Sequence, residues 1–399
     1  MNGNQLFAGR MENIRASEIR ELLKITERPE VISFAGGLPA PELFPMEALA
    51  KVASKTILED GMKALQYSTT EGFAPLREKI ACRMNKVCGT RVAKDEILIT
   101  SGSQQALDFI GKAFIDIGDE ILLESPSYLG AINAFRAYEP TFLEVETDDE
   151  GMLPEALEKA LLQAKRPKFI YVIPDYQNPT GRTWSLERRK ALVEIAEKYN
   201  VAIVEDNPYG ELRFEGDALP SVKSLDRNGL VIYLGTFSKT LCPGMRVGWM
   251  AANPIFRDKF TLVKQGADLH SSTISQMQID RLLVSFDFDA HIQKLREVYR
   301  SRRNAIIEAM EACFPSEIRF NRPRGGLFTW VELPSGMNAR RLLEKALERN
   351  VAFVPGGSFY PCRARENVMR INYSNMPEDR IREGIQRLAG AIESLRELA

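Results

Sequence analysis

The chain has 399 residues, of which 44% are apolar, and a formal net charge of -1 at pH 7. This length exceeds that of one typical domain, so we expect two domains that share a large core. The nearly balanced charge excludes a general electrostatic attraction to nucleic acid or to an anionic membrane. An anionic ligand must therefore be bound by a few placed cationic groups.

The cysteines and histidines point to no framework of disulfides or metal ligands. Five cysteines are scattered along the chain without a CxxC pair, and an odd number argues against a complete set of disulfides. His270 and His291 are too few and too far apart to predict a metal site. The first residues are polar and charged, unlike a secretory signal, and no run of about 18 apolar residues predicts a membrane span. We expect a cytoplasmic protein.

In chain order, the first predicted elements are a helix and a loop. Residues Ser17–Lys24 have the pattern of a short amphipathic helix with Ser17 as its N-cap. Residues Ile32–Pro45 are rich in glycine and proline and predict a loop.

The middle of the chain alternates between short apolar runs and helical patterns. The predicted strands are Glu96–Thr100, Glu120–Glu124, Phe169–Ile173, Val201–Glu205 and Val231–Gly235, and Leu186–Tyr199 is one of the helices between them. Strands that alternate with helices predict a mostly parallel sheet covered on both faces, which makes this part an α/β domain.

The pattern changes near residue 290. A long charged helix from His291 precedes strand-like segments at Gly326–Leu333 and Val368–Tyr373, and a last helix is predicted within Pro377–Leu398. We expect a large domain over residues 45–290. Residues 1–44 and 291–399 are expected to form a smaller α+β domain.

Several predicted strands are followed by residues with a chemical use. In an open parallel sheet, ligands bind beyond the carboxyl ends of the strands. Ser103 and Gln104 follow the first strand and begin a helix, whose free N–H groups favour an anion. Ordinary helix capping explains the same residues. Asn178 follows the third strand and precedes a proline, so its amide projects from a tight turn, which is equally typical of a structural Asn-Pro turn.

The last two strands of this series end near an acid and a lysine. Asp206, with Tyr209 nearby, is compatible with a helix cap, a metal ligand or a cofactor partner. Lys239 is isolated from other basic residues, and a desolvated lysine has a lowered pKa and forms Schiff bases. A surface lysine is the alternative. Arg246 follows a Pro-Gly turn that folds it back toward the same place.

Taken together, these segments resemble a known family. The motifs are FAGGLPAPELFP, QYSTTEGFAPLR, TSGSQQALD, ESPSYLGA, QNPTG, EDNPYGEL, GTFSKTLCPGMRVGW, KQGADLH, RPRGGLFTW and MRINYS, and the resemblance runs from about residue 13 to residue 375. The chain resembles the fold-type I aminotransferases of class I and II that depend on pyridoxal 5′-phosphate (PLP). Within that group it is most similar to the 2-aminoadipate/kynurenine aminotransferase branch. The motif EDNPYGEL departs from many relatives at Asn207 and Pro208 but keeps the spacing from Asp206 to Tyr209.

The resemblance implies a role for each matching residue. Lys239 would hold the cofactor as a Schiff base, and Asp206 would keep the pyridine nitrogen protonated. Asn178 and Tyr209 would bind the phenolic oxygen, and Tyr128 would stack on the ring. The phosphate would be bound by Ser103, Gln104, Thr236, Ser238, Arg246 and, from the neighbouring subunit of a homodimer, Tyr67.

The resemblance also implies a substrate site. Arg370 would bind the α-carboxylate with two hydrogen bonds, a geometry that suits arginine. Gly37 and Asn178 would contact the substrate, and Ser17 and Arg20, on a covering N-terminal helix, would meet its distal end. We expect transfer of an amino group between an L-amino acid (2-aminoadipate, glutamate, leucine or an aromatic donor) and a 2-oxo acid such as 2-oxoglutarate.

Two other function classes are alternatives to an aminotransferase. A β-lyase or a decarboxylase would use the same lysine, aspartate and arginine. A ligand-sensing domain of a transcription regulator is disfavoured, because the sequence shows no helix-turn-helix segment and no basic domain.

Overall fold

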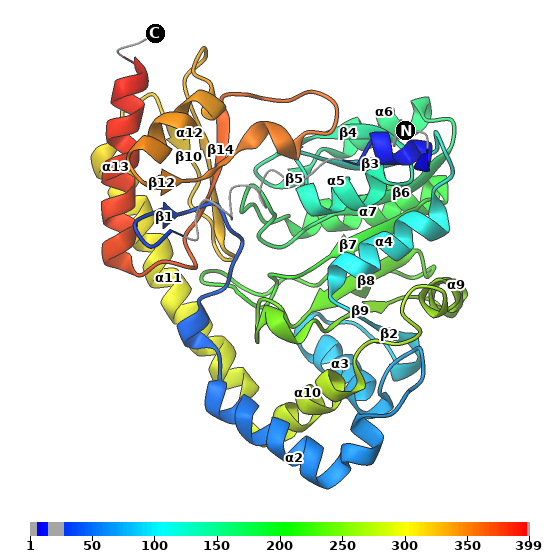
Figure 1. The fold of residues 1–399 in the computed structure, drawn as a ribbon. Coiled ribbons are helices and arrows are strands. Elements are labelled where there is room, and N and C mark those ends of the chain that lie inside the picture. Colours follow the sequence, from blue (N-terminus) through cyan, green and yellow to red (C-terminus); the bar gives the residue numbers. More distant parts are fainter. Residues whose placement is uncertain (1–5, 15–27, 397–399) are drawn as a thin grey trace.

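The computed structural model describes residues 6–14 and 28–396 (Figure 1). The predicted helix Ser17–Lys24, with Ser17 and Arg20, therefore lies outside the described residues. Within those ranges no helix is long and apolar enough to cross a membrane.

The centre of the fold is an eight-stranded sheet in the order β2-β9-β8-β7-β6-β3-β4-β5. Its strands are β2 (Ile97–Thr100), β3 (Glu120–Ser125), β4 (Thr141–Asp148), β5 (Gly151–Met152), β6 (Pro167–Val172), β7 (Ala202–Asp206), β8 (Val231–Thr236) and β9 (Gly248–Ala251). The pairs β4-β3, β3-β6, β6-β7 and β7-β8 are parallel, whereas β9 and β5 are antiparallel to their neighbours. The expected mostly parallel sheet is confirmed.

Helices cover both faces of this sheet, and the strand side chains alternate between two cores. On β6, Phe169 and Tyr171 join one buried cluster, while Ile170 and Val172 join the other. The first cluster includes residues of α4 (Ser103–Phe114), α5 (Leu129–Arg136) and α9 (Pro254–Gln265), and the second includes residues of α6 (Pro154–Gln163), α7 (Leu186–Tyr199) and α8 (Val222–Leu225). Burial on both faces explains why these strands have continuous apolar sequences.

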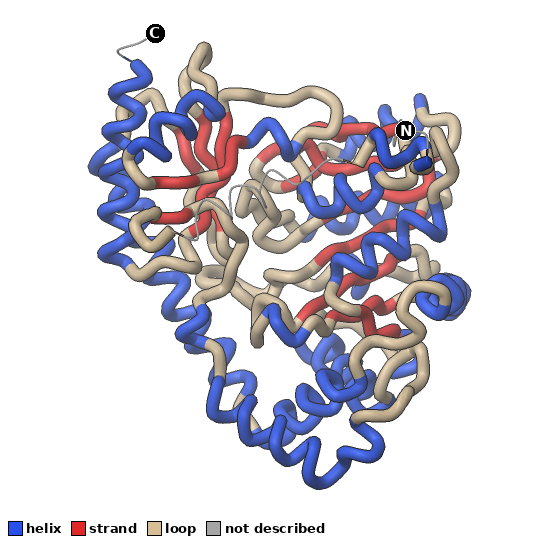
Figure 2. Tube along the Cα trace, in the orientation of Figure 1, coloured by secondary structure: helices blue, strands red, loops and turns tan. Residues whose placement is uncertain are grey.

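A second region is built on a four-stranded antiparallel sheet in the order β10-β11-β14-β13. Its elements are β10 (Arg319–Phe320), β11 (Phe328–Glu332), β13 (Val354–Pro355), β14 (Val368–Asn372), α11 (Phe288–Cys313), α12 (Ala339–Glu348) and α13 (Glu378–Arg396). The short strand β1 (Ile32–Ser33) pairs in parallel with β12 (Val351–Ala352) next to this sheet. Figures 1 and 2 show this region beside the large sheet, with α11 running away from it toward the helices below.

The helices below are α2 (Met46–Ala64), α3 (Ala74–Val87) and α10 (Thr273–Ser285), and α10 packs against both α2 and α3.

The four-stranded antiparallel sheet and its helices form the smaller α+β region that the sequence predicts. The predicted boundary between residues 290 and 291 falls in the first turn of α11, a single continuous helix. The division at that point stays a prediction.

The sequence did not predict three strands of the large sheet, which are β4, β5 and β9. The strand β5 has only two residues, too few for a pattern. The segment of β4 alternates between apolar and charged residues, as in LEVE, because the strand lies near an edge and is only partly buried. The strand β9 has four residues and follows directly on the Pro-Gly loop, so its pattern is too short to detect.

Candidate active site

A cavity of about 490 Å³ lies where the carboxyl ends of the parallel strands face the small antiparallel sheet. Most of the sequence-predicted site residues line it: Gly37, Ser103, Gln104, Tyr128, Asn178, Asp206, Tyr209, Thr236, Ser238, Lys239, Arg246 and Arg370. Of the remaining predicted residues, Ser17 and Arg20 lie outside the described ranges. Tyr67 does not line the cavity within this chain. Its side chain is 79% exposed and meets the ring of His270 edge-on.

Lys239 follows β8 and is partly buried in the cavity wall. Its Nζ donates a hydrogen bond to the backbone carbonyl of Gly37 at 2.7 Å. Burial lowers the pKa of the amine to about 8, and the charges of Arg370 and Arg246 act in the same direction, while Asp206 opposes them. A lysine with this pKa has a substantial neutral fraction near pH 8, which makes it a competent nucleophile.

Asp206 ends β7 and is almost fully buried. Its Oδ2 accepts a hydrogen bond from the hydroxyl of Tyr171 at 2.8 Å, while its Oδ1 is buried and has no hydrogen-bond partner among the described residues. Burial raises the pKa of this carboxyl to about 6, although the hydrogen bond from Tyr171 and the charge of Lys239 lower it. The free oxygen is an acceptor that awaits a donor from a ligand.

Asn178 connects Tyr209 with Arg370. Its Nδ2 donates to the hydroxyl of Tyr209 at 3.5 Å, and its Oδ1 accepts from Nη1 of Arg370 at 2.8 Å. Both Asn178 and Tyr209 are buried. The long distance to Tyr209 leaves both groups able to meet a shared ligand atom.

Arg370 lies on β14 and reaches the cavity from the small sheet. Its Nη2 donates to the carbonyl of Ala35 at 2.6 Å, and its guanidinium packs over the rings of Phe328 and Phe359, 4.3 and 5.2 Å from their centroids. Burial lowers the pKa of Arg370 to about 10. Among the described residues it has no carboxylate partner within ion-pair distance, and its Nε has no hydrogen-bond acceptor. A buried, unpaired guanidinium is a binding site for an anionic group.

The opposite end of the cavity is more exposed and contains the start of α4. Gly102, at the N-cap, has φ +77°, and a Cβ atom there would lie 2.5 Å from Nη2 of Arg246. That Nη2 donates to the carbonyl of Ser101 at 3.0 Å. Thr236 donates to Ser238 at 2.9 Å, which places two hydroxyls near the same end. A helix N-terminus with hydroxyls and an arginine is suited to a phosphate.

Tyr128 lies at the N-cap of α5, against a glycine. A Cβ atom on Gly130 would come within 2.4 Å of the Tyr128 ring, so only glycine permits this ring position. Gln104 donates to the carbonyl of Gly130 at 3.1 Å and joins the starts of α4 and α5.

The sequence reasoning missed several residues that shape the site. Tyr171 lies within β6, in an apolar run where an aromatic ring is typical of the core. Phe328 and Phe359 form the surface on which Arg370 rests, and Ala35 contributes only its carbonyl. No side-chain pattern signals a contact made by a backbone carbonyl.

These features fit PLP, which has a basic ring nitrogen, an aldehyde and a phosphate. The free Oδ1 of Asp206 suits the protonated ring nitrogen, the amine of Lys239 suits the aldehyde, and the α4 N-terminus with Arg246 suits the phosphate. The fold and the site thus define a PLP-dependent enzyme of fold type I.

Comparisons with known proteins give the family. The profile of the aminotransferase class I and II family matches residues 30–388. The chain is 46% identical to aromatic-amino-acid aminotransferase 1 of Thermococcus litoralis, over 97% of this chain and 94% of that one. It is also 46% identical to the 2-aminoadipate transaminase of Thermus thermophilus, over 99% and 98% of the two chains.

A solved structure agrees with this. The α-aminoadipate aminotransferase of Thermus thermophilus, in complex with N-(5′-phosphopyridoxyl)-L-leucine, superposes with a TM-score of 0.94 at 44% identity, and the match covers 100% of both chains. The chain belongs to the class I and II aminotransferases, and its cofactor is PLP.

Proposed function

We propose that this aminotransferase moves an amino group between an L-amino acid and a 2-oxo acid such as 2-oxoglutarate by a ping-pong mechanism. The observation that carries the proposal is that one cavity joins a partly buried lysine, a carboxylate with a free buried oxygen and a buried unpaired arginine. Relatives that act on 2-aminoadipate and on aromatic amino acids, and a relative solved with a leucine adduct of the cofactor, suggest the range of donors.

Each polar residue of the cavity then has a task. When bound, PLP supplies an electron sink for the negative charge that develops at the substrate Cα. Asp206 would hold a proton on the ring nitrogen through Oδ1, and Lys239 would hold the cofactor at its aldehyde group, with loss of water. Arg370 binds the substrate α-carboxylate through its free Nε and one Nη group, beside Asn178 and Gly37.

Lys239 is also the group proposed to move a proton at the substrate Cα. It is the one lysine among the described residues that line the cavity. Its lowered pKa keeps it partly neutral near pH 8, so it can accept and return a proton.

A β-lyase or a decarboxylase would use the same lysine, aspartate and arginine, so product analysis separates the proposals. Incubation with 2-aminoadipate and 2-oxoglutarate should give glutamate in equal amount to the 2-oxo acid formed from the donor. Initial rates at several fixed acceptor concentrations should give parallel double-reciprocal lines, as a ping-pong mechanism requires. Ammonia or carbon dioxide released without glutamate would support the alternatives.

Substrate choice is proposed to depend on Arg20 and Ser17 at the distal end of the substrate. An arginine on an N-terminal helix can pair with the distal carboxylate of 2-aminoadipate or glutamate and move to solvent for an apolar chain, which avoids a buried unpaired charge. Arg20→Ala should raise KM for 2-aminoadipate and 2-oxoglutarate roughly tenfold to a hundredfold. Its kcat/KM for leucine should barely change, and equal losses for both classes would contradict the role.

We further propose a homodimer in which Tyr67 completes the partner's phosphate site. The side chains of Leu58, Met62, Leu65 and Tyr67 are exposed along α2 and the segment after it, which is typical of an interface. Sedimentation should find a dimer at assay concentrations, and an active monomer would contradict the proposal. Cytoplasmic location stays a prediction from the sequence.

A further inference from the structure

A buried hydrogen-bond network joins the two loops that carry Asn178 and Tyr209. Asp175 lies three residues before Asn178 in the loop after β6, and Asn207 lies two residues before Tyr209 in the loop after β7. Nδ2 of Asn207 donates to Oδ2 of Asp175 at 3.0 Å, and Oδ1 of Asn207 accepts from the N–H of Gly210 at 2.8 Å. The side-chain amide of Asn207 therefore connects the loop after β6 with both ends of the Asn207–Gly210 turn.

Asp175 is itself held in place by an arginine of α7. Arg189, on α7, pairs with its Oδ1 at 2.6 Å and is completely buried. The same guanidinium donates to the carbonyls of Pro174 and Pro220. The network thus passes from α7 through Asp175 and Asn207 to the loop that carries Tyr209.

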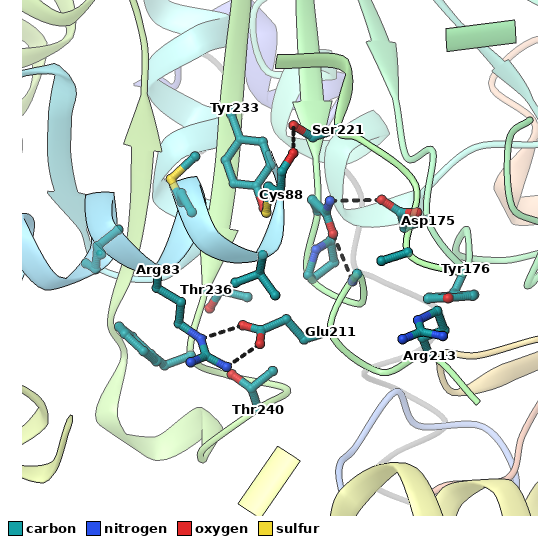
Figure 3. Close-up of a pocket in the computed structure, with 18 of the residues that line it drawn as sticks. Arg83, Cys88, Asp175, Tyr176, Glu211, Arg213, Ser221, Tyr233, Thr236 and Thr240 are labelled. Carbon is teal, nitrogen blue, oxygen red and sulfur yellow. Dashed lines mark hydrogen bonds and ion pairs between the residues drawn. The ribbon is translucent and has the colours of Figure 1, made fainter. Parts of the chain in front are cut away.

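The space behind this network is hollow. A second cavity, of about 70 Å³, is lined by Asp175, Asn207, Gly210 and Glu211 (Figure 3). Atoms that face a cavity lack packing partners on that side. The 207–211 loop is therefore held largely by polar contacts, those of Asn207 at its start and the ion pair of Glu211 with Arg83 at its end.

Glycine at position 210 is part of the same arrangement. A Cβ atom there would lie 2.3 Å from Oδ1 of Asn207, so a larger residue would displace the amide. The close approach of the Gly210 N–H to Asn207 thus requires this glycine.

We propose that Asn207 is a positioning residue that sets the spacing between Asn178 and Tyr209. This spacing determines whether both side chains can donate hydrogen bonds to the phenolic oxygen of the cofactor. The inference rests on the roles proposed for Asn178 and Tyr209. These two side chains meet at 3.5 Å, the outer limit of a hydrogen bond, so their mutual contact alone does not fix their spacing. The shorter hydrogen bonds of Asn207, to Asp175 and to the N–H of Gly210, help to fix the spacing instead.

The test uses the holoenzyme and follows the pH dependence of the cofactor's visible absorbance. Donors to the phenolic oxygen stabilise its anionic form, so losing their alignment should raise the pKa of this transition. Asn207→Ala should raise it by about 1 and lower kcat roughly tenfold. Asn207→Asp places a second carboxylate against Asp175 and should have a similar effect.

The double variant D175N/N207D is the rescue. The amide introduced at 175 donates to the carboxylate introduced at 207, so the hydrogen bond re-forms with donor and acceptor exchanged. The net charge is unchanged, but the carboxylate moves one hydrogen bond away from Arg189. The absorbance pKa should return most of the way to that of the wild type. A shift in the double variant equal to the sum of the shifts in Asp175→Asn and Asn207→Asp would mean that the two side chains act independently, and would overturn the inference.

A matched control and two reference variants separate the outcomes. Asn85 also hydrogen-bonds through both amide atoms, to Thr90 and Val92, but lines neither cavity, so Asn85→Ala should leave the absorbance pKa unchanged. Asn178→Ala and Tyr209→Phe should each raise it. If they do and Asn207→Ala does not, the positioning role is wrong. If neither does, the proposed roles of Asn178 and Tyr209 fail instead.

Discussion

At one end of the active-site cavity Asp206 and Arg370 are 2% and 1% exposed, whereas at the other end Arg246 is exposed to solvent. We call these the buried end and the exposed end. Burial shifts the pKa values of Asp206 and Arg370 because it removes water from their charged groups. The protein replaces only part of the lost hydrogen bonds, so each group keeps an atom without a partner among the described residues. At the exposed end Arg246 is open to solvent, so water can hydrogen-bond to its charged group. The ligand must therefore contribute most at the buried end, where substitutions should have the largest effects.

The largest effect is expected for Lys239→Ala, which removes the amine proposed to bind the cofactor aldehyde. The value of kcat should fall on the order of 10⁵-fold, as is typical when a covalent nucleophile is lost. Borohydride should no longer attach the cofactor to the chain. Lys198, on the surface and paired with Glu158, offers a control, and Lys198→Ala should keep full activity. Labelling of a lysine other than Lys239 in the wild type would refute the assignment.

Asp206→Asn tests the carboxylate of the buried end. The variant should still bind PLP, but kcat should fall roughly 10²- to 10³-fold because the ring nitrogen loses its charged partner. Asp206→Glu should keep part of the activity. Steady-state kinetics with 2-aminoadipate would measure both, and a near-wild-type Asn variant would show that Oδ1 has no electrostatic role.

Arg370→Ala should lower kcat/KM about tenfold to a hundredfold for acidic and apolar donors alike, since all of them share the α-carboxylate. Arg370→Lys should recover little, because a lysine cannot make two parallel hydrogen bonds. A donor panel distinguishes this uniform loss from the selective loss expected for Arg20→Ala. A loss confined to one donor class would assign Arg370 to the distal end.

The lowered pKa of Lys239 predicts how the apoenzyme captures the cofactor. Only the neutral amine reacts, so the rate of forming the borohydride-reducible adduct should rise about tenfold per pH unit below pH 8 and then level off. A lysine with an ordinary pKa would show a continued rise toward pH 10. Stopped-flow absorbance with apoenzyme and PLP across pH 6 to 10 would measure the profile.

The smallest effect is expected at the exposed end. Arg246→Ala should raise the Kd for PLP only about threefold to tenfold, and the difference should shrink as salt is added, because an exposed charge is screened. Equilibrium titration of the apoenzyme at two ionic strengths would test it. A loss as large as that of Arg370→Ala would mean that burial does not govern how strongly the two ends depend on charge.

The sequence was informative where the site lies at the carboxyl ends of parallel strands. Ser103, Asn178, Asp206 and Lys239 each follow a different predicted strand, and the geometry of a parallel sheet alone predicts that they meet. The structure brings them to one cavity. For each residue taken alone, a structural interpretation such as helix capping or a surface lysine remains open. Only the four residues considered together favour a functional site.

Arg370 could not be placed in this way. It lies on a strand of the separate antiparallel sheet, and nothing in periodicity or spacing relates that sheet to the ends of the large one. Only the resemblance to a family put Arg370 in the site. Tyr171 was missed for the opposite reason: a tyrosine within an apolar strand is usually core, and its hydroxyl contact with Asp206 depends on the register of β6 against β7.

The segment after β1 reaches the buried Arg370 and the partly buried Lys239 through its main chain alone. The carbonyl of Ala35 accepts from Arg370, and that of Gly37 accepts from Lys239. Because every amino acid carries the same carbonyl, replacing a side chain here leaves both acceptors in place. An alanine scan or a substitution library would therefore leave both hydrogen bonds in place and record only the effects of the side chains that it adds or removes. Removing one residue between Ser33 and Gly37 would instead change which carbonyls face the cavity, so a library of single-residue deletions is the genetic screen that would reveal them.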